Sequence, residues 1–367
     1  LAENKARDEA LSHAQSEFEK IQIQRASLPV ARCREQILEY VAKYNIIIVE
    51  AETGSGKTTQ IPQFLYEAGY CKKGMIGCTQ PRRVACMEVS ARVAKEMGVK
   101  LGNEVGYSVR FENKTNDRTV IKYLTDGMLL REFLTEPDLS SYSVMMIDEA
   151  HERSLHTDIL LGLIKDVSRA RDDLKIIISS ATMDSEKFSN FFDEAPILSI
   201  EGRRFNVTTH YLKAPENDYI EACIVSILQI HVSQPLPGDI LVFLTGQQDI
   251  EAVQEGLLQR TRALGRKIKE LLVLPLYSSL PIKEQQLCFQ PTPENVRKVV
   301  LATNVAETSL TIDNICYVVD SGLCKQNSFN PRSGMDSLIV TPISKAAAMQ
   351  REGRAGRTRD GHCFRLY

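Results

Sequence analysis

A run of small and polar residues, 51-AETGSGKTTQ-60, directly follows the apolar stretch 45-NIIIVE-50. Glycines in such a turn let successive backbone amides point at one phosphate, and the helix that follows adds partial positive charge. A lysine here can reach the β and γ phosphates, and a neighbouring hydroxyl can hold Mg²⁺. An ordinary Gly/Ser turn is the alternative, but the flanking strand and helix patterns favour phosphate binding. The predicted residues are Gly54, Ser55, Gly56, Lys57, Thr58 and Thr59.

The first position of this motif is Ala51, where the general pattern has glycine. If this position needs φ > 0, alanine costs about 1 kcal/mol. We therefore expect weaker preorganisation of the loop at worst.

A pair of carboxylates ends another apolar stretch, where 143-SVMMI-147 leads into 148-DEAH-151. Asp148 is the candidate ligand for Mg²⁺, and Glu149 is the candidate base that orients and deprotonates a water near that metal. The alternative is the start of a helix capped by an aspartate. Their position after a buried strand favours the catalytic interpretation.

A basic segment near the end of the sequence, 344-SKAAAMQREGRAGR-357, is predicted to be a helix with Ser344 as its N-cap. At helical spacing Gln350, Arg354 and Arg357 would lie near one face, where arginines can stabilise charge on a transferring phosphate. A solvated basic helix end is the alternative. Glu352 lies between these residues and could reduce the positive potential.

The elements that must position these residues alternate between short apolar runs and helical patterns, which predicts doubly wound α/β sheets. Two such series indicate two tandem α/β domains with mostly parallel sheets, joined near residues 196–207. We expect an N-terminal helical extension at 1–26, a first domain at 27–200 and a second at 201–367. The predicted strands are 46–51, 75–80, 119–125, 143–148, 175–180, 239–245, 271–277, 298–303, 315–320 and 362–367.

Composition narrows the class of protein. The chain has 367 residues, 43% hydrophobic and 25% charged, with a net charge of -2, so a nucleic-acid partner would need local basic patches. Nine cysteines without metal-ligand spacing predict reduced thiols in a cytosolic or nuclear protein. No secretory signal or membrane helix is expected, and the Leu at position 1 suggests part of a longer protein.

Taken together, the motifs resemble those of DEAH-box RNA helicases, whose core is two RecA-like P-loop domains. The resemblance spans residues 27–367 and is strongest for the pre-mRNA-splicing members, particularly the ATPase that acts before the first splicing step. The matching stretches are 51–59, 79-TQPRRVA-85, 125-TDGMLLRE-132, 148–151, 180-SAT-182, 302-ATNVAETSLTI-312 and 350–357.

What the resemblance implies is an RNA-dependent NTP phosphohydrolase that uses ATP and Mg²⁺ and moves 3′-to-5′. It also implies single-stranded RNA, spliceosomal proteins and a G-patch-type activator as partners, a nuclear location and further C-terminal domains. In this family an Arg and a Phe sandwich the adenine, so other NTPs are tolerated. By motif position these are Arg92 and Phe289, with Asp313 near the ribose and Ser309 as a sensor of nucleotide state. The alternative for Phe289 is core packing.

Polar and basic residues at the ends of the predicted strands are candidates for sequence-tolerant contacts with RNA phosphates and sugars. Turn chemistry or capping is the alternative for each one alone. The resemblance adds a strand-separating hairpin within 326–342. The candidates are Arg82, Arg83, Arg110, Thr125, Gly127, Thr245, Gly246, Gln247, Thr303 and Asn304.

Other functions share much of this chemistry. An ATP-dependent RNA clamp or scaffold with incidental hydrolysis would keep the phosphate loop, but it needs neither Glu149 as a base nor arginines from a second domain. A helicase of ribosome biogenesis and a DNA-directed motor would use the same residues.

Overall fold

The computed structural model describes residues 17–52, 54–181, 185–202, 205–214, 216, 218–264, 269–307, 312–357 and 359–367. The chain divides into two compact units, Leu1–Arg203 and Arg204–Tyr367, and the division falls within the predicted join at 196–207. In the described part of the chain, no helix has the length and apolar character needed to cross a membrane. All nine cysteines are free thiols.

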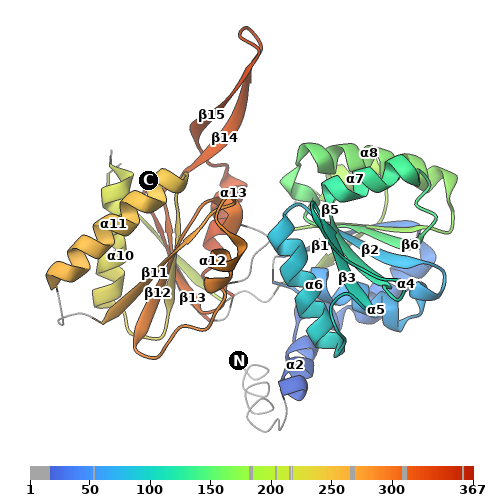
Figure 1. Cartoon of the computed structure of the whole chain (residues 1–367), viewed down its shortest axis with the longest axis horizontal. Coiled ribbons are helices and arrows are strands. Elements are labelled where there is room, and N and C mark those ends of the chain that lie inside the picture. Colours follow the sequence, from blue (N-terminus) through green and yellow to red (C-terminus); the bar gives the residue numbers. More distant parts are fainter. Residues whose placement is uncertain are drawn as a thin grey trace. The chain divides into compact units, whose positions relative to one another are not determined.

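Unit 1 is built on an eight-stranded sheet in the order β4-β3-β5-β2-β6-β7-β1-β8 (Figure 1). Its pairs are parallel except β3 with β4. The strands are β1 Ile46–Ala51, β2 Met75–Gln80, β3 Val105–Val109, β4 Glu112–Lys114, β5 Ile121–Thr125, β6 Tyr142–Ile147, β7 Lys175–Ser180 and β8 Ile197–Ile200. The helices are α2 Glu17–Ala26, α3 Pro29–Arg32, α4 Arg34–Lys43, α5 Lys57–Glu67, α6 Arg83–Met97, α7 Asp126–Thr135, α8 Leu155–Ala170 and α9 Ser185–Phe191, with short 3₁₀ turns at Tyr70–Lys72 and Ala150–Glu152.

Strand β1 shows why this sheet carries helices on both faces. Successive side chains of a strand point to opposite faces. Ile47 and Val49 pack with α4, α5 and α6 in one core, whereas Ile48 packs with α7, α8 and α9 in a second core. Continuous apolar runs are therefore buried on both sides, as predicted for a doubly wound sheet.

Unit 2 has a six-stranded sheet in the order β11-β12-β10-β13-β16-β9, in which every pair is parallel. The strands are β9 Val207–Tyr211, β10 Asp239–Phe243, β11 Glu270–Leu276, β12 Val296–Ala302, β13 Ile315–Asp320 and β16 Gly361–Arg365. The helices are α10 Tyr219–Ser233, α11 Gln247–Leu264, α12 Ile282–Leu287 and α13 Lys345–Glu352, with a 3₁₀ turn at Asn304–Ala306. The predicted fold class, two tandem α/β domains with mostly parallel sheets, is confirmed.

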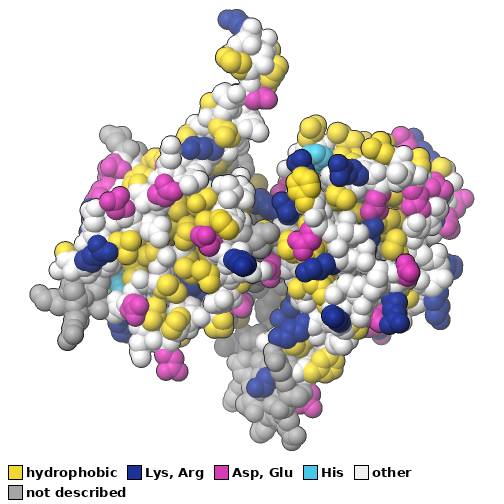
Figure 2. Space-filling view, viewed as in Figure 1, with side chains coloured by type: hydrophobic (Ala, Val, Ile, Leu, Met, Phe, Trp, Pro, Cys, Tyr) yellow, Lys and Arg dark blue, Asp and Glu magenta, His cyan; other side chains and the backbone are white. Residues whose placement is uncertain are grey.

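A hairpin projects from unit 2, formed by β14 Leu323–Asn330 and β15 Met335–Pro342 (Figure 1). It occupies the predicted 326–342 region, and its turn contains Gly334 at φ 66°. Apolar side chains are exposed along it, and a basic side chain lies at its tip (Figure 2). The exposed apolar residues are Phe329, Met335, Leu338, Ile339 and Val340.

Candidate functional site

The loop between β1 and α5 has the backbone of a phosphate cradle. Gly54 and Gly56 have φ of 88° and 90°, a region that favours glycine. Gly56 is the N-cap of α5 and offers no side-chain cap, so the amides at the start of α5 can bond an anion. Ala51 is the last residue of β1, pairs with Ile200 and does not have a positive φ, so the strain considered for alanine there does not arise.

Four side chains from the phosphate loop and the end of β6 form the centre of the site. Lys57 Nζ donates to Glu149 Oε1 at 3.2 Å, and Thr58 Oγ1 donates to Asp148 Oδ2 at 2.5 Å. Asp148 and Glu149 are buried, 1% and 4% exposed. The sequence prediction placed Lys57, Thr58, Asp148 and Glu149 in one site, and the structure brings all four together.

Electrostatics keep Glu149 ionised in this buried position. Burial raises the pKa of its carboxyl, but the ammonium of Lys57, followed by His151, outweighs burial, and the pKa lies below the ordinary value. An ionised carboxylate can act as a general base toward a water molecule within hydrogen-bond reach. Its Oε2 atom is buried, makes no hydrogen bond among the described residues and lies 3.4 Å from His151 Nε2.

These residues fit magnesium and a triphosphate. Ser55 Oγ is a second buried polar atom with no partner among the described residues, and it lies in the phosphate loop. The described residues hold no cluster of three or more His, Cys, Asp or Glu side chains, so the protein would supply few ligands. Mg²⁺ commonly binds in this way, through one or two protein oxygens with phosphates and waters completing the shell. Thr58 and Asp148, with Glu149 beside them, are the oxygen donors at this position.

Two residues of this site were not assigned a role from the sequence. Gln80, the last residue of β2, donates to Asp148 Oδ2 at 2.8 Å. His151 Nδ1 accepts from the amide of Ala181 at 3.1 Å, which links the acidic turn to the end of β7. Both residues follow or end a buried strand, and polar residues at such strand ends are common in ligand sites of α/β sheets. That position was the sequence signal that could have identified them.

The RNA candidates of unit 1 follow strands β3, β5 and β2, which are neighbours in the sheet. Gln80 and Thr125 pair across β2 and β5, so the loops after these strands leave the sheet at one edge. Arg83 and Arg110 are exposed, whereas Arg82 is partly buried and pairs with Glu152 at 3.4 Å. Thr125 is the N-cap residue of α7 and is buried, and Gly127 lies in the first turn of that helix.

In unit 2 the candidates follow two neighbouring parallel strands, β10 and β12. Thr245, Gly246 and Gln247 come after β10, and Thr303 and Asn304 come after β12. The Leu244 amide donates to the Ala302 carbonyl at 2.8 Å, which holds the two strand ends together. Thr245 is buried, and its hydroxyl and its backbone amide both donate to Asp249 Oδ2, at 2.5 Å and 3.3 Å.

The basic segment forms a shorter helix than predicted. Helix α13 begins after Ser344, which caps it through the amide of Ala347, and it ends at Glu352. The predicted helix to 357 is wrong because glycines at 353 and 356 disfavour helix, and a Cβ at Gly356 would lie 2.7 Å from Val207 Cγ2.

Gln350 lies on α13, but Arg354 and Arg357 lie after its last residue. Contacts with other parts of unit 2, and not the helix, therefore position these two arginines. Arg354 is buried and its Nε donates to the Glu307 carbonyl at 2.8 Å, and Arg354 and Arg357 both border a gap beside Ala306 that is too small to hold water. The carboxylate of Glu352 pairs with Arg365 at 2.7 Å, so that pairing compensates part of its charge.

The candidates for the base and ribose belong to both units. Arg92 in unit 1 is exposed and bonds Glu96. In unit 2, Phe289 is half-buried in the turn after α12 and does not belong to the core clusters, and Asp313 is exposed. Ser309 lies outside the described residues.

Comparison with known proteins agrees with this arrangement. A family model described as DEAD/DEAH box helicase matches residues 22–191, and one described as helicase conserved C-terminal domain matches residues 221–359. The chain is similar to the crystal structure of the Escherichia coli DEAH/RHA helicase HrpB, with 38% sequence identity and a TM-score of 0.84. The match covers 93% of this chain and 42% of that protein, so the chain spans less than half of its length. The chain thus contains the two domains of a DEAD/DEAH box helicase, a class of NTP-hydrolysing enzymes.

Proposed function

We propose that this chain is the motor core of an RNA-dependent ATPase that translocates 3′-to-5′ on single-stranded RNA and remodels RNA–protein complexes. The observation that carries the proposal is the buried group formed by Lys57, Thr58, Asp148 and Glu149 at the carboxyl edge of the unit 1 sheet. The RNA candidates follow neighbouring strands of that sheet, so both ligands would bind along one edge.

Each residue of the group has a distinct part in hydrolysis. Magnesium and ATP supply an activated γ-phosphate, held by Lys57, Thr58, Asp148 and the loop amides. Glu149 bonds Lys57 through Oε1, and its Oε2 makes no hydrogen bond among the described residues and lies 3.4 Å from His151 Nε2, so Oε2 can take a proton from water without giving up the lysine contact. Other NTPs are expected to serve because an arginine stack reads no base edge.

Unit 2 supplies Gln350, Arg354 and Arg357 in this proposal, and the arginines offset charge that develops on the phosphate. RNA phosphates and sugars would contact the residues that follow β2, β3 and β5 in unit 1 and β10 and β12 in unit 2. Such contacts carry little sequence information and weaken as salt rises.

A nuclear role in pre-mRNA splicing, with spliceosomal proteins and a G-patch-type activator as partners, is the finer part of the proposal and is supported by the motif resemblance alone. A role in ribosome biogenesis is the alternative. Addition of a G-patch-type peptide tests the partner, because a true activator raises the RNA-stimulated rate and leaves Glu149→Gln inactive.

The first experiment measures ATP hydrolysis with and without single-stranded poly-purine RNA, and with DNA of the same sequence. Glu149→Gln is expected to lower the rate by about 10²- to 10⁴-fold. Glu186→Gln, which changes an exposed carboxylate on α9, is the matched control and should not change it.

The alternatives give different results. Hydrolysis stimulated equally by DNA would indicate a nucleic-acid motor without RNA preference. Retention of RNA that depends on ATP but not on Glu149 would indicate a clamp. Absence of hydrolysis that depends on Glu149 would refute the enzyme proposal.

A further inference from the structure

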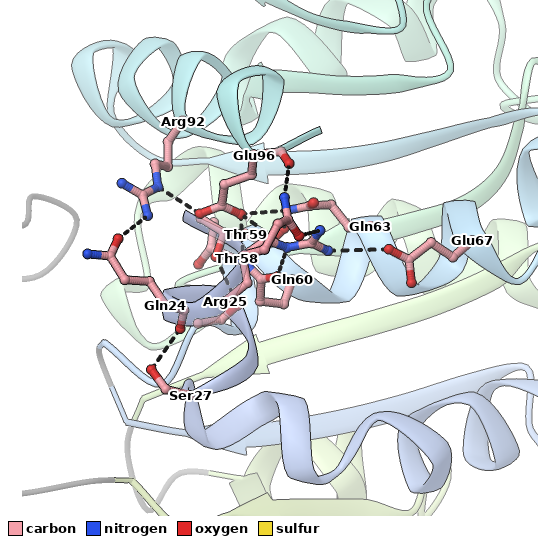
Figure 3. A network of polar contacts seen from close by, with 12 residues as sticks. Gln24, Arg25, Ser27, Thr58, Thr59, Gln60, Gln63, Glu67, Arg92 and Glu96 are labelled. Atoms are coloured by element: carbon pink, nitrogen blue, oxygen red, sulfur yellow. Dashed lines mark hydrogen bonds and ion pairs between the residues drawn. The ribbon is translucent and has the colours of Figure 1, made fainter. Parts of the chain in front are cut away.

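A buried carboxylate joins the phosphate-loop helix to the candidate base contact (Figure 3). Glu96 on α6 is 2% exposed. Its Oε2 accepts from Gln60 Nε2 and Gln63 Nε2 on α5, both at 2.8 Å. Its Oε1 accepts from Arg92 Nε at 2.7 Å, one turn earlier on its own helix. A single side chain therefore contacts both α5 and Arg92.

Helix α2 completes this arrangement from the other side. Gln24 Oε1 accepts from Arg92 Nη2 at 3.3 Å, so Arg92 is bonded at two of its three nitrogens. Gln22 Nε2 donates to the Glu96 carbonyl at 2.8 Å, and Arg25 Nε donates to Gln60 Oε1 at 2.9 Å. These contacts fasten α2 to both α5 and α6.

The chain just after α2 also contacts the phosphate loop itself. The Val30 amide donates to the Ser55 carbonyl at 3.1 Å. An added Cβ at Gly56 would lie 2.8 Å from Leu28 Cδ1, which shows how closely that side chain covers the loop. Residues 22–30 thus pack against the phosphate loop and against the helices on either side of it.

We propose that Glu96 and Gln24 are positioning residues that hold the Arg92 guanidinium as one face of the base site and so determine how much the base adds to nucleotide affinity. The inference rests on the proposed function. Hydrogen bonds to a guanidinium lie in its plane, so contacts at Nε and Nη2 leave the flat faces available for stacking. The Arg92 side chain is 45% exposed, so it has room for a ligand.

Replacing Glu96 by glutamine removes the negative charge that holds the guanidinium and leaves Arg92 itself in place. Three N–H donors, from Gln60, Gln63 and Arg92, converge on the two carboxylate oxygens of Glu96. A glutamine at position 96 has one oxygen and one NH₂ group, so its NH₂ group must face at least one of these donors. Either Arg92 or the glutamines of α5 then face a donor. An arginine without these hydrogen bonds has more rotamer freedom to lose when it stacks on a base. The base then adds less to the affinity for the nucleotide.

The experiment compares the affinities of the full chain for Mg²⁺-ATP and for Mg²⁺ with inorganic triphosphate, which lacks base and ribose. The ratio of the two reports what the nucleoside adds. Glu96→Gln should lower this ratio about 5-fold, with triphosphate affinity unchanged. Gln24→Ala should act in the same direction and less strongly. Glu67→Gln is the matched control, because Glu67 bonds Arg25 and Arg34 but not Arg92.

An Arg92→Ala background separates positioning from general stability. If Glu96 acts through Arg92, Glu96→Gln has no further effect on the ratio in that background. An unchanged ratio in Glu96→Gln, or an equal loss of ATP and triphosphate affinity, would overturn the positioning role and leave the proposed function intact. A wild-type chain that binds neither ligand would refute the proposed function, and one that binds both equally would refute the base site.

Discussion

The two phosphate-loop glycines offer a matched pair of substitutions that separate backbone strain from steric contact. Gly54 and Gly56 have almost the same φ, 88° and 90°. A Cβ at Gly54 would meet nothing within 4 Å, whereas one at Gly56 would lie 2.8 Å from Leu28 Cδ1 and 3.1 Å from Val30 Cγ1. The same change, glycine to alanine, therefore adds different costs at the two positions.

The expected magnitudes follow from these contacts. Gly54→Ala should lower the free energy of unfolding by about 1–2 kcal/mol, the cost of left-handed backbone for an L-residue. Gly56→Ala adds overpacking against Leu28, which brings the total loss to about 2–5 kcal/mol. In a Leu28→Ala background most of the added cost should disappear, because the side chain nearest the new methyl group is gone.

Urea unfolding of the nucleotide-free protein, followed by far-UV circular dichroism, measures these differences. If the two units unfold in separate transitions, the transition of unit 2 must stay unchanged in every variant, which provides an internal control. Equal destabilisation by Gly54→Ala and Gly56→Ala would refute the steric argument. So would a Gly56→Ala cost that is unaffected by Leu28→Ala.

Two further predictions concern unit 2. Arg351 is fully buried and pairs with Asp320 at 2.7 Å and Glu307 at 2.6 Å. Arg351→Met should lower the free energy of unfolding by about 3–5 kcal/mol, because it leaves those carboxylates uncompensated. A loss under about 1 kcal/mol in urea unfolding would contradict this. Burial, followed by nearby cations, lowers the pKa of His231, which bonds the Lys269 carbonyl. The unfolded chain then takes up the proton first, so stability should fall as pH drops below the ordinary histidine value of about 6.5. His231→Gln should flatten the dependence measured between about pH 7.5 and 5.5, and identical slopes for the two proteins would show that another group titrates.

Long apolar runs and the motifs attached to their ends were enough to predict the central strands and the main catalytic group. Strands β1, β2, β7 and β13 have the predicted bounds, because their residues are buried on both faces of a sheet and so form nearly continuous apolar or small-residue runs. Strands β3, β4, β8 and β9 were not predicted. Strand β9, 207-VTTHY-211, lies at the sheet edge and is half polar, so its sequence lacks the apolar run that identifies a buried strand.

Contacts between distant segments were beyond prediction from the sequence. Gln24 and Arg92 are 68 positions apart, and Gln60 and Glu96 are 36 apart, so no local pattern indicates that they meet. The over-extended helix at 344–357 has a similar cause. Periodicity favoured one helical face, but the close approach of Gly356 to Val207 requires a turn that only the folded unit specifies.

The end of β2 and the loop after it have a thermodynamic consequence, because together they contact the acidic pair and the turn that follows it. Gln80 bonds Asp148 beside the phosphate loop, and two residues later Arg82 pairs with Glu152 in the turn after that acidic pair. If nucleotide binding shifts this loop, the affinity of Arg82 and Arg83 for a phosphate backbone changes with it. Linkage then requires that RNA change the affinity for nucleotide by the same factor. The change in RNA affinity caused by nucleotide and the change in nucleotide affinity caused by RNA report the same coupling free energy. It can therefore be measured from either ligand.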